Sequence, residues 1–386
     1  MTAKMKQLRR VVTGNDESGK SKVVLDGPAP NTHPGGPHGN GWTNLWIWDE
    51  SPAPLGSLKD GGDLPYAFPG PPNGGHLRVV HADGGPQNYD PAKDVRLVSP
   101  HEPKVSPSGR MWDRGGKSAF TSEDHKTETV DYAILIEGER NLRLSDCEVN
   151  WQPGDVVIQV GAYHQWASPN QAGLVAFDMI AARFVDGSAG LGQGHDPVMT
   201  FDSSHKLPGG VTPPRRIVTI DREEGKSTLV SDGPTPDIRF DSARPGFSSS
   251  RMWVTDKTPA SIVFETLHLP HTIEPPVNGS VLRMLTIPPD DTWKGKVGIA
   301  EVKSYFQSMG SPQASTYTPT SPHLYMQKTR SLDFVIVVKG EIVLVLDAQE
   351  VVLKAGDFVI QRGTNHAWSN RSSQPALLAI ASHDAF

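Results

Sequence analysis

The feature that most constrains the fold of this chain is a long internal repeat. Residues 125–168 are matched without a gap by residues 327–370, and each residue, such as Asp131, lies 202 positions before its partner, here Asp333. A repeat at a fixed period has to be recognised before the fold is assigned, and a solenoid needs at least about three copies. Two long copies therefore indicate a duplicated domain.

The repeat extends upstream and divides the chain. The segment RRVVTGNDESGKSKVVLDGPAP from Arg9 returns as RRIVTIDREEGKSTLVSDGPTP from Arg215. The stretch between the copies is rich in Gly, Ser and Pro, which is typical of a connector. The predicted parts are an N-terminal half at 1–183 (barrel core 111–182), a linker at 184–214 and a C-terminal half at 215–386 (barrel core 315–386).

The local pattern predicts an all-β protein. Short β-branched runs, such as Val335–Val338, end at glycines, and the chain carries 38 Gly and 34 Pro. Short strands separated by turn residues favour barrels or sandwiches. The best helix candidate is 297–309, where Ile299, Val302 and Phe306 recur at helical spacing.

Composition excludes several classes of protein. The net charge of −6 and the isoelectric point near 6.2 give no electrostatic case for binding nucleic acid. No apolar run approaches membrane-spanning length, and we expect no membrane partner. The single Cys147 rules out an internal disulfide and suits a reducing compartment, so we expect a cytoplasmic protein.

Both copies carry the same spaced motif. It consists of Asp131 followed by an aromatic residue and Gly138, then Gly154-Asp155, then Gly161-x-x-His164, and it recurs from Asp333 to His366. This pattern resembles the cupin superfamily, and two copies resemble a bicupin. The resemblance implies two cupin-type jelly-roll barrels related by duplication, each with a ligand site in its mouth.

The resemblance also implies a metal site in the first half. The family's ligand positions correspond here to His125, Thr127, Asp131 and His164. Separations of two and four place the first three side chains on one face of a strand. His125, Asp131 and His164 form a set of two imidazoles and a carboxylate, which suits Fe(II) and leaves open positions. Zinc, Mn and Ni are alternatives, with one divalent metal expected per chain.

The second copy serves as an internal control. Its ligand positions hold Gln327, Thr329, Asp333 and His366, which is a poor set for a transition metal. Residues shared by both copies can be structural, as a buried Asp–His contact would be. The difference between His125 and Gln327 is therefore the better mark of function, and we expect the active site in the N-terminal barrel.

Further candidates surround this site in the sequence. Asp131, His164, Tyr163 and Gln159 are the candidate catalytic residues. Arg78 and Arg283 correspond in the two copies, and each could bind a carboxylate ligand or form a structural ion pair. His76 and His81 are interpreted as ordinary loop histidines.

Three functions remain open. The first is an Fe(II) oxygenase acting on a small aromatic or keto substrate. The second is a non-redox metal-dependent lyase, dehydratase, isomerase or decarboxylase. The third is a metal-free bicupin that binds a small ligand. A homodimer is a further expectation, because exposed strand edges invite pairing.

The asymmetry between the copies gives a first prediction. If the first barrel holds a metal through His125, His125→Ala abolishes metal retention, because two protein ligands are too few to hold a divalent ion. Gln327→Ala leaves the metal content unchanged and is the matched control. Elemental analysis of the purified variants measures both. A full metal complement in His125→Ala would contradict the assignment.

Overall fold

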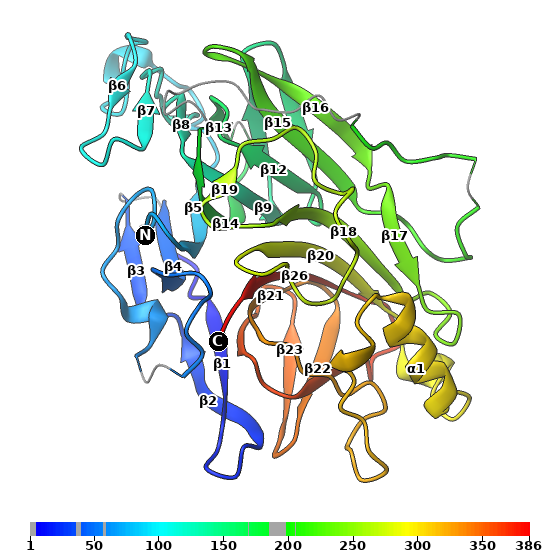
Figure 1. Ribbon diagram of the computed structural model, residues 1–386. Coiled ribbons are helices and arrows are strands. Elements are labelled where there is room, and N and C mark those ends of the chain that lie inside the picture. The colour runs from blue at the N-terminus through cyan, green and yellow to red at the C-terminus, as the bar shows by residue number, and fades with distance from the viewer. Residues whose placement is uncertain (1–4, 36–39, 57–58, 169, 185–197, 205) are drawn as a thin grey trace.

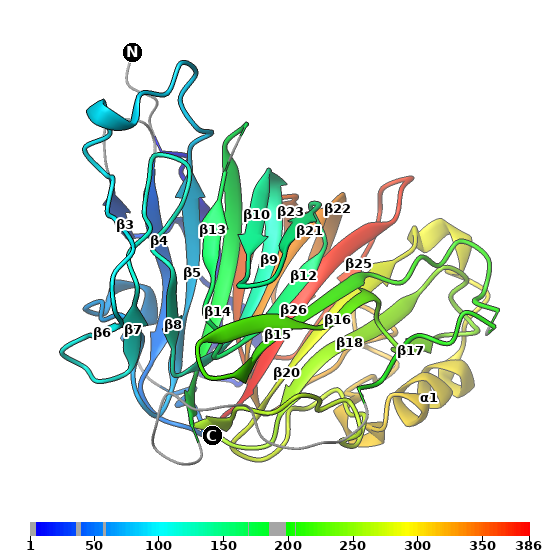
Figure 2. The ribbon, with the colours of Figure 1, turned by 90° about the horizontal axis from the view of Figure 1, so that it is seen from above.

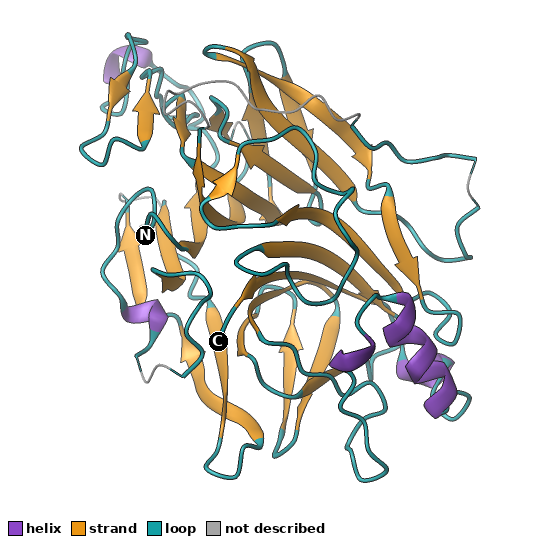
Figure 3. Cartoon of the chain, viewed as in Figure 1, coloured by secondary structure: helices purple, strands orange, loops and turns teal. Residues whose placement is uncertain are grey.

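The computed structural model describes residues 5–35, 40–56, 59–168, 170–184, 198–204 and 206–386 (Figure 1). Strands dominate these residues and the few helical segments lie at the periphery (Figure 3). The predicted all-β class is thereby confirmed. Much of the predicted linker, namely 185–197 and residue 205, lies outside the described residues.

Two large sheets form the body of the molecule. The first contains, in spatial order, β16 (Lys226–Pro234), β15 (Arg215–Glu223), β12 (Val156–Val160), β9 (Thr129–Gly138), β14 (Gly173–Arg183), β5 (Gly75–Ala82), β4 (Gly41–Trp48) and β3 (Asn31–Pro34), with β19 (Ala260–Ser261) paired to β14. The second contains β17 (Asp237–Phe240), β18 (Ser248–Thr255), β20 (Ser280–Ile287), β26 (Ala376–Asp384), β21 (Ser331–Lys339), β24 (Phe358–Arg362), β1 (Arg9–Asn15) and β2 (Ser21–Pro28).

Three small sheets complete the strand inventory. They are β11 (Glu148–Trp151), β10 (Arg140–Arg143) and β13 (Gln165–Ala167); β23 (Glu350–Lys354), β22 (Glu341–Leu346) and β25 (His366–Ser369); and β6 (Lys104–Val105), β7 (Met111–Asp113) and β8 (His125–Thr127). The 3₁₀ turns lie at Gly61–Asp63, Pro91–Lys93, Asp290–Thr292 and Pro312–Ala314.

Each large sheet closes against one small sheet to form a barrel. In the N-terminal barrel, Phe177 of the large sheet and Trp151 and Trp166 of the small sheet share one buried cluster. In the C-terminal barrel, Ile380 and Trp368 belong to the corresponding cluster. Apolar side chains on the inner faces of both sheets therefore meet inside each barrel, and the two predicted barrels are confirmed.

The outer faces of the two large sheets bury a third cluster between the barrels. It contains Tyr132 and Ile134 from the first sheet and Phe334 and Met284 from the second. The Tyr132 and Ser280 hydroxyls lie 2.8 Å apart across this interface. Figures 1 and 2 show the two sheets lying against each other, with β14 and β26 near the centre.

The two halves exchange their first hairpins. Strand β1 pairs in parallel with β24 of the C-terminal barrel, and β15 pairs in parallel with β12 of the N-terminal barrel. The hairpins β1–β2 and β15–β16 therefore lie in the barrel of the other half. Membership of the sheets thus differs from the division of the sequence at residues 9–28 and 215–234.

One glycine position explains why the repeat keeps a glycine before its histidine. Gly161 and Gly363 have φ angles of 56° and 57°, in the left-handed region that favours glycine. The turn at this residue reverses the chain after β12 and after β24. The turn brings His164 and His366 back toward the mouth of their barrels, at equivalent positions in the two copies.

The predicted helix is confirmed as α1, Ile299–Ser308. Val302 and Phe306 are buried as expected, whereas Ile299 is half exposed because it opens the first turn. The Glu301 carboxylate accepts from the Gly298 backbone N–H at 2.8 Å and caps the helix. Among the described residues, no helix has the length and apolar character needed to cross a bilayer.

The exchanged hairpin is anchored by a buried ion pair, which gives a second prediction. The Lys126 ammonium lies 2.9 Å from the Asp221 carboxylate of β15, with side chains 1% and 2% exposed. Removing one partner of such a pair costs about 3–5 kcal/mol. We expect Asp221→Ala to lower the free energy of unfolding by that amount in urea titrations.

The control lies two residues further along the same strand. Glu223 pairs with Lys226, and both side chains are largely exposed. Glu223→Ala should change the free energy of unfolding little, because water already solvates both charges. Equal losses in the two variants would contradict the role of the Lys126–Asp221 pair.

Candidate functional site

A row of four side chains, three of them polar, crosses the inner face of the N-terminal barrel. Gln159, Asp131, Met179 and His76 are cross-strand neighbours on β12, β9, β14 and β5. Direct neighbours point to the same face of a sheet, so these side chains face the barrel interior together. The alternation expected from the sequence thus places Asp131 and Gln159 inside.

Two histidines meet at one end of this row. His125 and His164 exchange backbone hydrogen bonds of 3.1 and 3.0 Å, and their ring centroids are 4.5 Å apart. The Nδ1 atoms lie 2.9 Å from the Glu123 and Ala162 carbonyl oxygens, respectively. A carbonyl accepts only from a protonated nitrogen, so Nδ1 of His125 carries hydrogen and its Nε2 keeps a lone pair. His164 Nδ1 also lies 2.9 Å from the side-chain nitrogen of Gln159, which only donates, so the two contacts of this atom call for opposite tautomers.

The C-terminal barrel supports this tautomer. His366 Nδ1 lies 2.9 Å from the Thr364 carbonyl oxygen, at the place of Ala162 in the first copy. Its Nε2 lies 3.2 Å from the Gln327 side-chain nitrogen, which can only donate. The Nε2 of His366 is thus an acceptor. By analogy with His366, we infer that His164 is also protonated on Nδ1, and it has His125 at the place of the donor Gln327.

The Asp131 side chain is buried, and no cation lies beside it among the described residues. Its Oδ1 has no hydrogen-bond partner among the described residues. Burial raises the pKa of the Asp131 carboxyl group to about 7, while a hydrogen bond from Thr129 lowers it and the charge of Asp178 raises it further. The acid is therefore stabilised in its neutral form, which is the opposite of what a bound cation would do.

The predicted metal set does not converge. Among the described residues, no three His, Cys, Asp or Glu side chains come together as metal ligands. His125 and His164 lie together, but Asp131 remains outside this pair. The Thr127 hydroxyl lies 2.6 Å from that of Thr129. These residues do not fit a three-ligand metal centre.

A buried guanidinium lies on the same inner face. Arg78 of β5 is a cross-strand neighbour of Phe177 on β14 and of Asn44 on β4. Its Nε and Nη2 both donate to Asn44 Oδ1 at 3.1 Å. Its Cζ lies 3.9 Å from the ring centroid of Tyr66 and 5.5 Å from that of Phe68.

No carboxylate neutralises this guanidinium among the described residues, although Arg78 is only 6% exposed. Burial lowers the pKa of Arg78, and the Tyr66 hydroxyl raises it. A buried charge costs several kcal/mol unless it is paired. The aromatic rings and the Asn44 amide compensate part of that cost, and an anion would compensate the rest.

Phe68 connects the guanidinium to the histidine pair. Its ring centroid lies 6.3 Å from that of His125 and 5.5 Å from Arg78 Cζ. His76 is fully buried beside Tyr66, and neither of its ring nitrogens has a hydrogen-bond partner among the described residues. Burial and the charge of Arg78 hold the pKa of His76 well below its usual value. A neutral, polar group thus faces the same interior.

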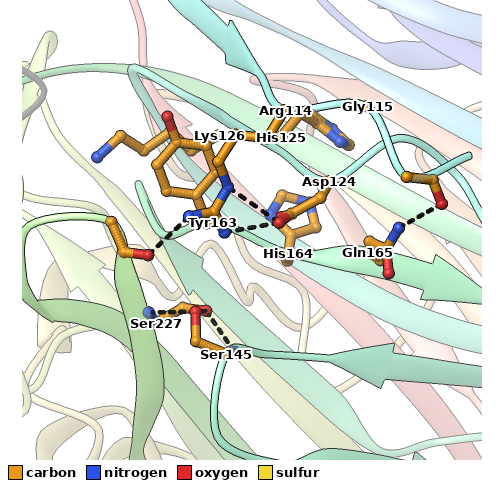
Figure 4. Close-up of polar contacts among 12 residues, drawn as sticks. Arg114, Gly115, Asp124, His125, Lys126, Ser145, Tyr163, His164, Gln165 and Ser227 are labelled. Atoms are coloured by element: carbon orange, nitrogen blue, oxygen red, sulfur yellow. Dashed lines mark hydrogen bonds and ion pairs between the residues drawn. The ribbon is translucent and has the colours of Figure 1, made fainter. Parts of the chain in front are cut away.

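Two cations flank a tyrosine at the rim beside the histidines. The Tyr163 ring lies between two cations, 3.7 Å from Arg114 Cζ and 4.6 Å from Lys126 Nζ. Arg114 binds Asp124 through two hydrogen bonds of 3.0 and 2.6 Å (Figure 4). Burial is the largest cause that raises the pKa of Tyr163 to about 12. Here Tyr163 packs the wall beside His164.

Sequence reasoning missed the residues that arrive from the other half. Thr219 of β15 donates its hydroxyl to Gln159 Oε1 at 2.6 Å, and the Tyr163 N–H donates to Asp221 Oδ1 at 3.0 Å. No local sequence pattern predicts these contacts, because parallel pairing between strands of different halves has no sequence motif. The interpretation of His76 and His81 as loop residues is wrong, since both lie on β5.

Comparison with known sequences matches part of the chain. A family model described as "Cupin domain" matches residues 319–381. "Phomopsin biosynthesis cluster protein C'" of Diaporthe leptostromiformis is 56% identical over 48 residues, 12% of this chain and 25% of the relative. "Oryzines biosynthesis cluster protein J" of Aspergillus oryzae is 44% identical over 46 residues, 12% and 26%. The matches thus span about a quarter of these relatives' length.

The matches among solved structures have low sequence identity and low TM-scores. AerE from Microcystis aeruginosa has a TM-score of 0.31 and 10% identity, covering 80% of this chain and 86% of that one. A variant of salicylate 1,2-dioxygenase from Pseudoaminobacter salicylatoxidans has a TM-score of 0.34 and 10% identity, covering 80% and 71%.

The raised pKa of Asp131 gives a third prediction. The carboxyl group titrates near pH 3.8 when unfolded and near 7 when folded, so between these values the folded state binds more protons. The free energy of unfolding therefore falls as pH rises from about 4 to 7, by a few kcal/mol, and then levels off. We expect Asp131→Asn to remove this loss.

Urea titrations of both proteins at pH 5 and pH 8 measure the effect. Asp131→Asn should gain stability relative to the unsubstituted protein at pH 8 and gain little at pH 5. A cation bound by Asp131 would hold its pKa low and make the variant less stable at pH 8. That reversed sign would refute the neutral carboxyl group.

Proposed function

We propose that this chain, whose residues 319–381 match a cupin family model, binds a small, flat organic anion through Arg78 of its N-terminal barrel and acts on it by proton transfer. The observation that carries this proposal is the buried guanidinium of Arg78, which has no carboxylate partner among the described residues. A planar fork of donors matches a carboxylate in two hydrogen bonds.

The surroundings of Arg78 favour a flat ligand. The rings of Trp42, Tyr66 and Phe68 lie 5.3, 3.9 and 5.5 Å from its Cζ, so they offer faces to a planar group bound beside it. Aromatic faces next to one charged group are typical of sites for small aromatic or keto acids. A ligand held by its carboxylate would extend past Phe68 toward His125.

The two histidines supply the proton-transfer groups. Burial and the neighbouring His125 hold the pKa of His164 well below its usual value, so its imidazole is neutral near pH 7. Its unprotonated Nε2 can accept a proton from a carbon or hydroxyl next to the bound carboxylate. The anion raises the basicity of the imidazole, and Arg78 stabilises the developing negative charge.

This chemistry corresponds to the isomerase, dehydratase, lyase or decarboxylase alternatives, with no change in oxidation state of the protein. Gln159 would act indirectly. Its Nε2 donates to the Ala162 carbonyl oxygen at 3.0 Å, and its Oε1 is held by Thr219. It thereby holds the Ala162 carbonyl in place and contacts the imidazole itself, with Nε2 lying 2.9 Å from His164 Nδ1.

The Fe(II) oxygenase has one observation in its favour, the adjacent unprotonated Nε2 atoms of His125 and His164. It lacks a third protein ligand within the described part of the chain. Metal content, measured as described for His125→Ala, distinguishes this candidate. Retained Fe(II) with oxygen uptake would replace proton transfer as the proposed function.

A fourth prediction tests the anion site. Benzoate should bind the unsubstituted protein, and Arg78→Met should weaken binding about 30-fold or more, since losing a buried charge pair costs about 2–5 kcal/mol. Isothermal titration calorimetry measures the affinity. Arg283→Met, the matched change in the other barrel, should leave benzoate binding unchanged.

Benzamide, which has the same shape and no charge, is the ligand control. It should bind much more weakly than benzoate to the unsubstituted protein. The proposal fails if benzamide and benzoate bind alike, if benzoate does not bind, or if Arg78→Met binds benzoate as tightly as the unsubstituted protein.

A further inference from the structure

The interior of the C-terminal barrel holds a second group of polar side chains without partners. Arg283 Nε, Asp333 Oδ1 and both polar atoms of Gln361 are buried, with no hydrogen-bond partner in the described part of the chain. The residues are 5%, 5% and 1% exposed. Buried polar groups are almost always paired, and leaving one unpaired costs about 1–3 kcal/mol.

These side chains face one another across the sheet. Asp333 and Gln361 are direct cross-strand neighbours on β21 and β24. Arg283 of β20 pairs with Ile380 of β26, and Ile380 pairs with Val335, two residues after Asp333. Residues two apart on a strand share a face. Because Ile380 and Val335 lie in the cluster inside the C-terminal barrel, Arg283, Asp333 and Gln361 face the same interior.

The duplicated half shows how such a group is satisfied. Gln159, the equivalent of Gln361, receives the Thr219 hydroxyl at 2.6 Å and donates to Ala162. In the C-terminal barrel, Thr13 of the exchanged strand lies 2.8 Å from Thr364 instead, and Gln361 is left without a partner. The Gln361 amide therefore occupies the same place as that of Gln159 but has no hydrogen-bond partner among the described residues.

Arg283 has no ion-pair partner either. Its charge interacts with Asp333, Tyr305 and Glu274 at a distance, but no carboxylate lies within 4.0 Å of it among the described residues. An internal salt bridge between Arg283 and Asp333 would have satisfied both groups. Because neither group satisfies the other, each calls for a polar partner that the described residues do not supply.

We propose that the C-terminal barrel binds a small hydroxycarboxylate between Arg283, Asp333 and Gln361. The guanidinium would bind the ligand carboxylate. Asp333 Oδ1 is an acceptor and calls for a donor, which a ligand hydroxyl supplies with its one hydrogen. Gln361 Nε2 donates to that hydroxyl oxygen or to the carboxylate. A ligand without a hydroxyl leaves Asp333 Oδ1 unpaired.

This site differs in chemistry from the N-terminal one. His366 Nε2 is occupied by Gln327, so the histidine has no lone pair to offer a ligand. The second site therefore binds without the proton-transfer group of the first. It stands whether or not the N-terminal barrel is a catalyst.

Calorimetry with L-malate and succinate tests the proposal on the full chain. The two differ by one hydroxyl, so malate should bind at least about tenfold more tightly than succinate, since leaving buried acceptors unpaired costs about 1–3 kcal/mol. Arg283→Met should abolish malate binding. Arg78→Met is the control and should leave it unchanged, which separates this site from the N-terminal one.

A stability measurement covers the case in which Arg283→Met fails to fold. Without ligand, Gln361→Leu should raise the melting temperature, because it removes two unpaired polar atoms at similar volume, and it should weaken malate binding. Gln159→Leu should lower the melting temperature, because it breaks bonds already made. The proposal is overturned if malate does not bind, binds no better than succinate, or binds Gln361→Leu as well as the unsubstituted protein.

Discussion

Parallel pairing between the halves is the constraint on which the rest of the structure depends. Strand β12 cannot complete its sheet without β15, and β24 cannot complete its sheet without β1. Each barrel therefore contains strands from both copies. Neither half completes its own sheet, because removing either half would expose an unpaired strand edge in the other.

The same exchange reaches the N-terminal site. Thr219 and Asp221 come from the second half and hold Gln159 and the Tyr163 backbone in the first. The buried pair of Lys126 and Asp221 fixes this hairpin over the barrel mouth. Site geometry and fold integrity thus rest on the same few contacts.

The sequence was sufficient to predict the local elements. Constant spacing between copies predicted two barrels, and the helical spacing around Val302 and Phe306 predicted α1. Alternation along β9 correctly placed Asp131 inside. The hairpin exchange was beyond reach, because Arg9 and Arg215 begin near-identical segments that would pair equally well within their own half. Contacts between halves have no local pattern.

The candidate site was predicted in part. Spacing brought His125 and His164 together, but it could not show that Asp131 lies near Gln159 and apart from both imidazoles. The role of Arg78 stayed open because ligand binding and ion pairing have the same sequence signal. That choice depends on whether a carboxylate lies within reach, which only the packing decides.

The two barrels differ because equivalent side chains have different hydrogen-bond partners. In the first copy, Asn44 accepts from Arg78, and Thr219 satisfies Gln159. In the second copy, Gln327 donates to the lone pair of His366. In the first copy, the equivalent His125 places a second imidazole beside His164. Identical scaffolds thereby present proton acceptors in one interior and mainly hydrogen-bonding groups in the other.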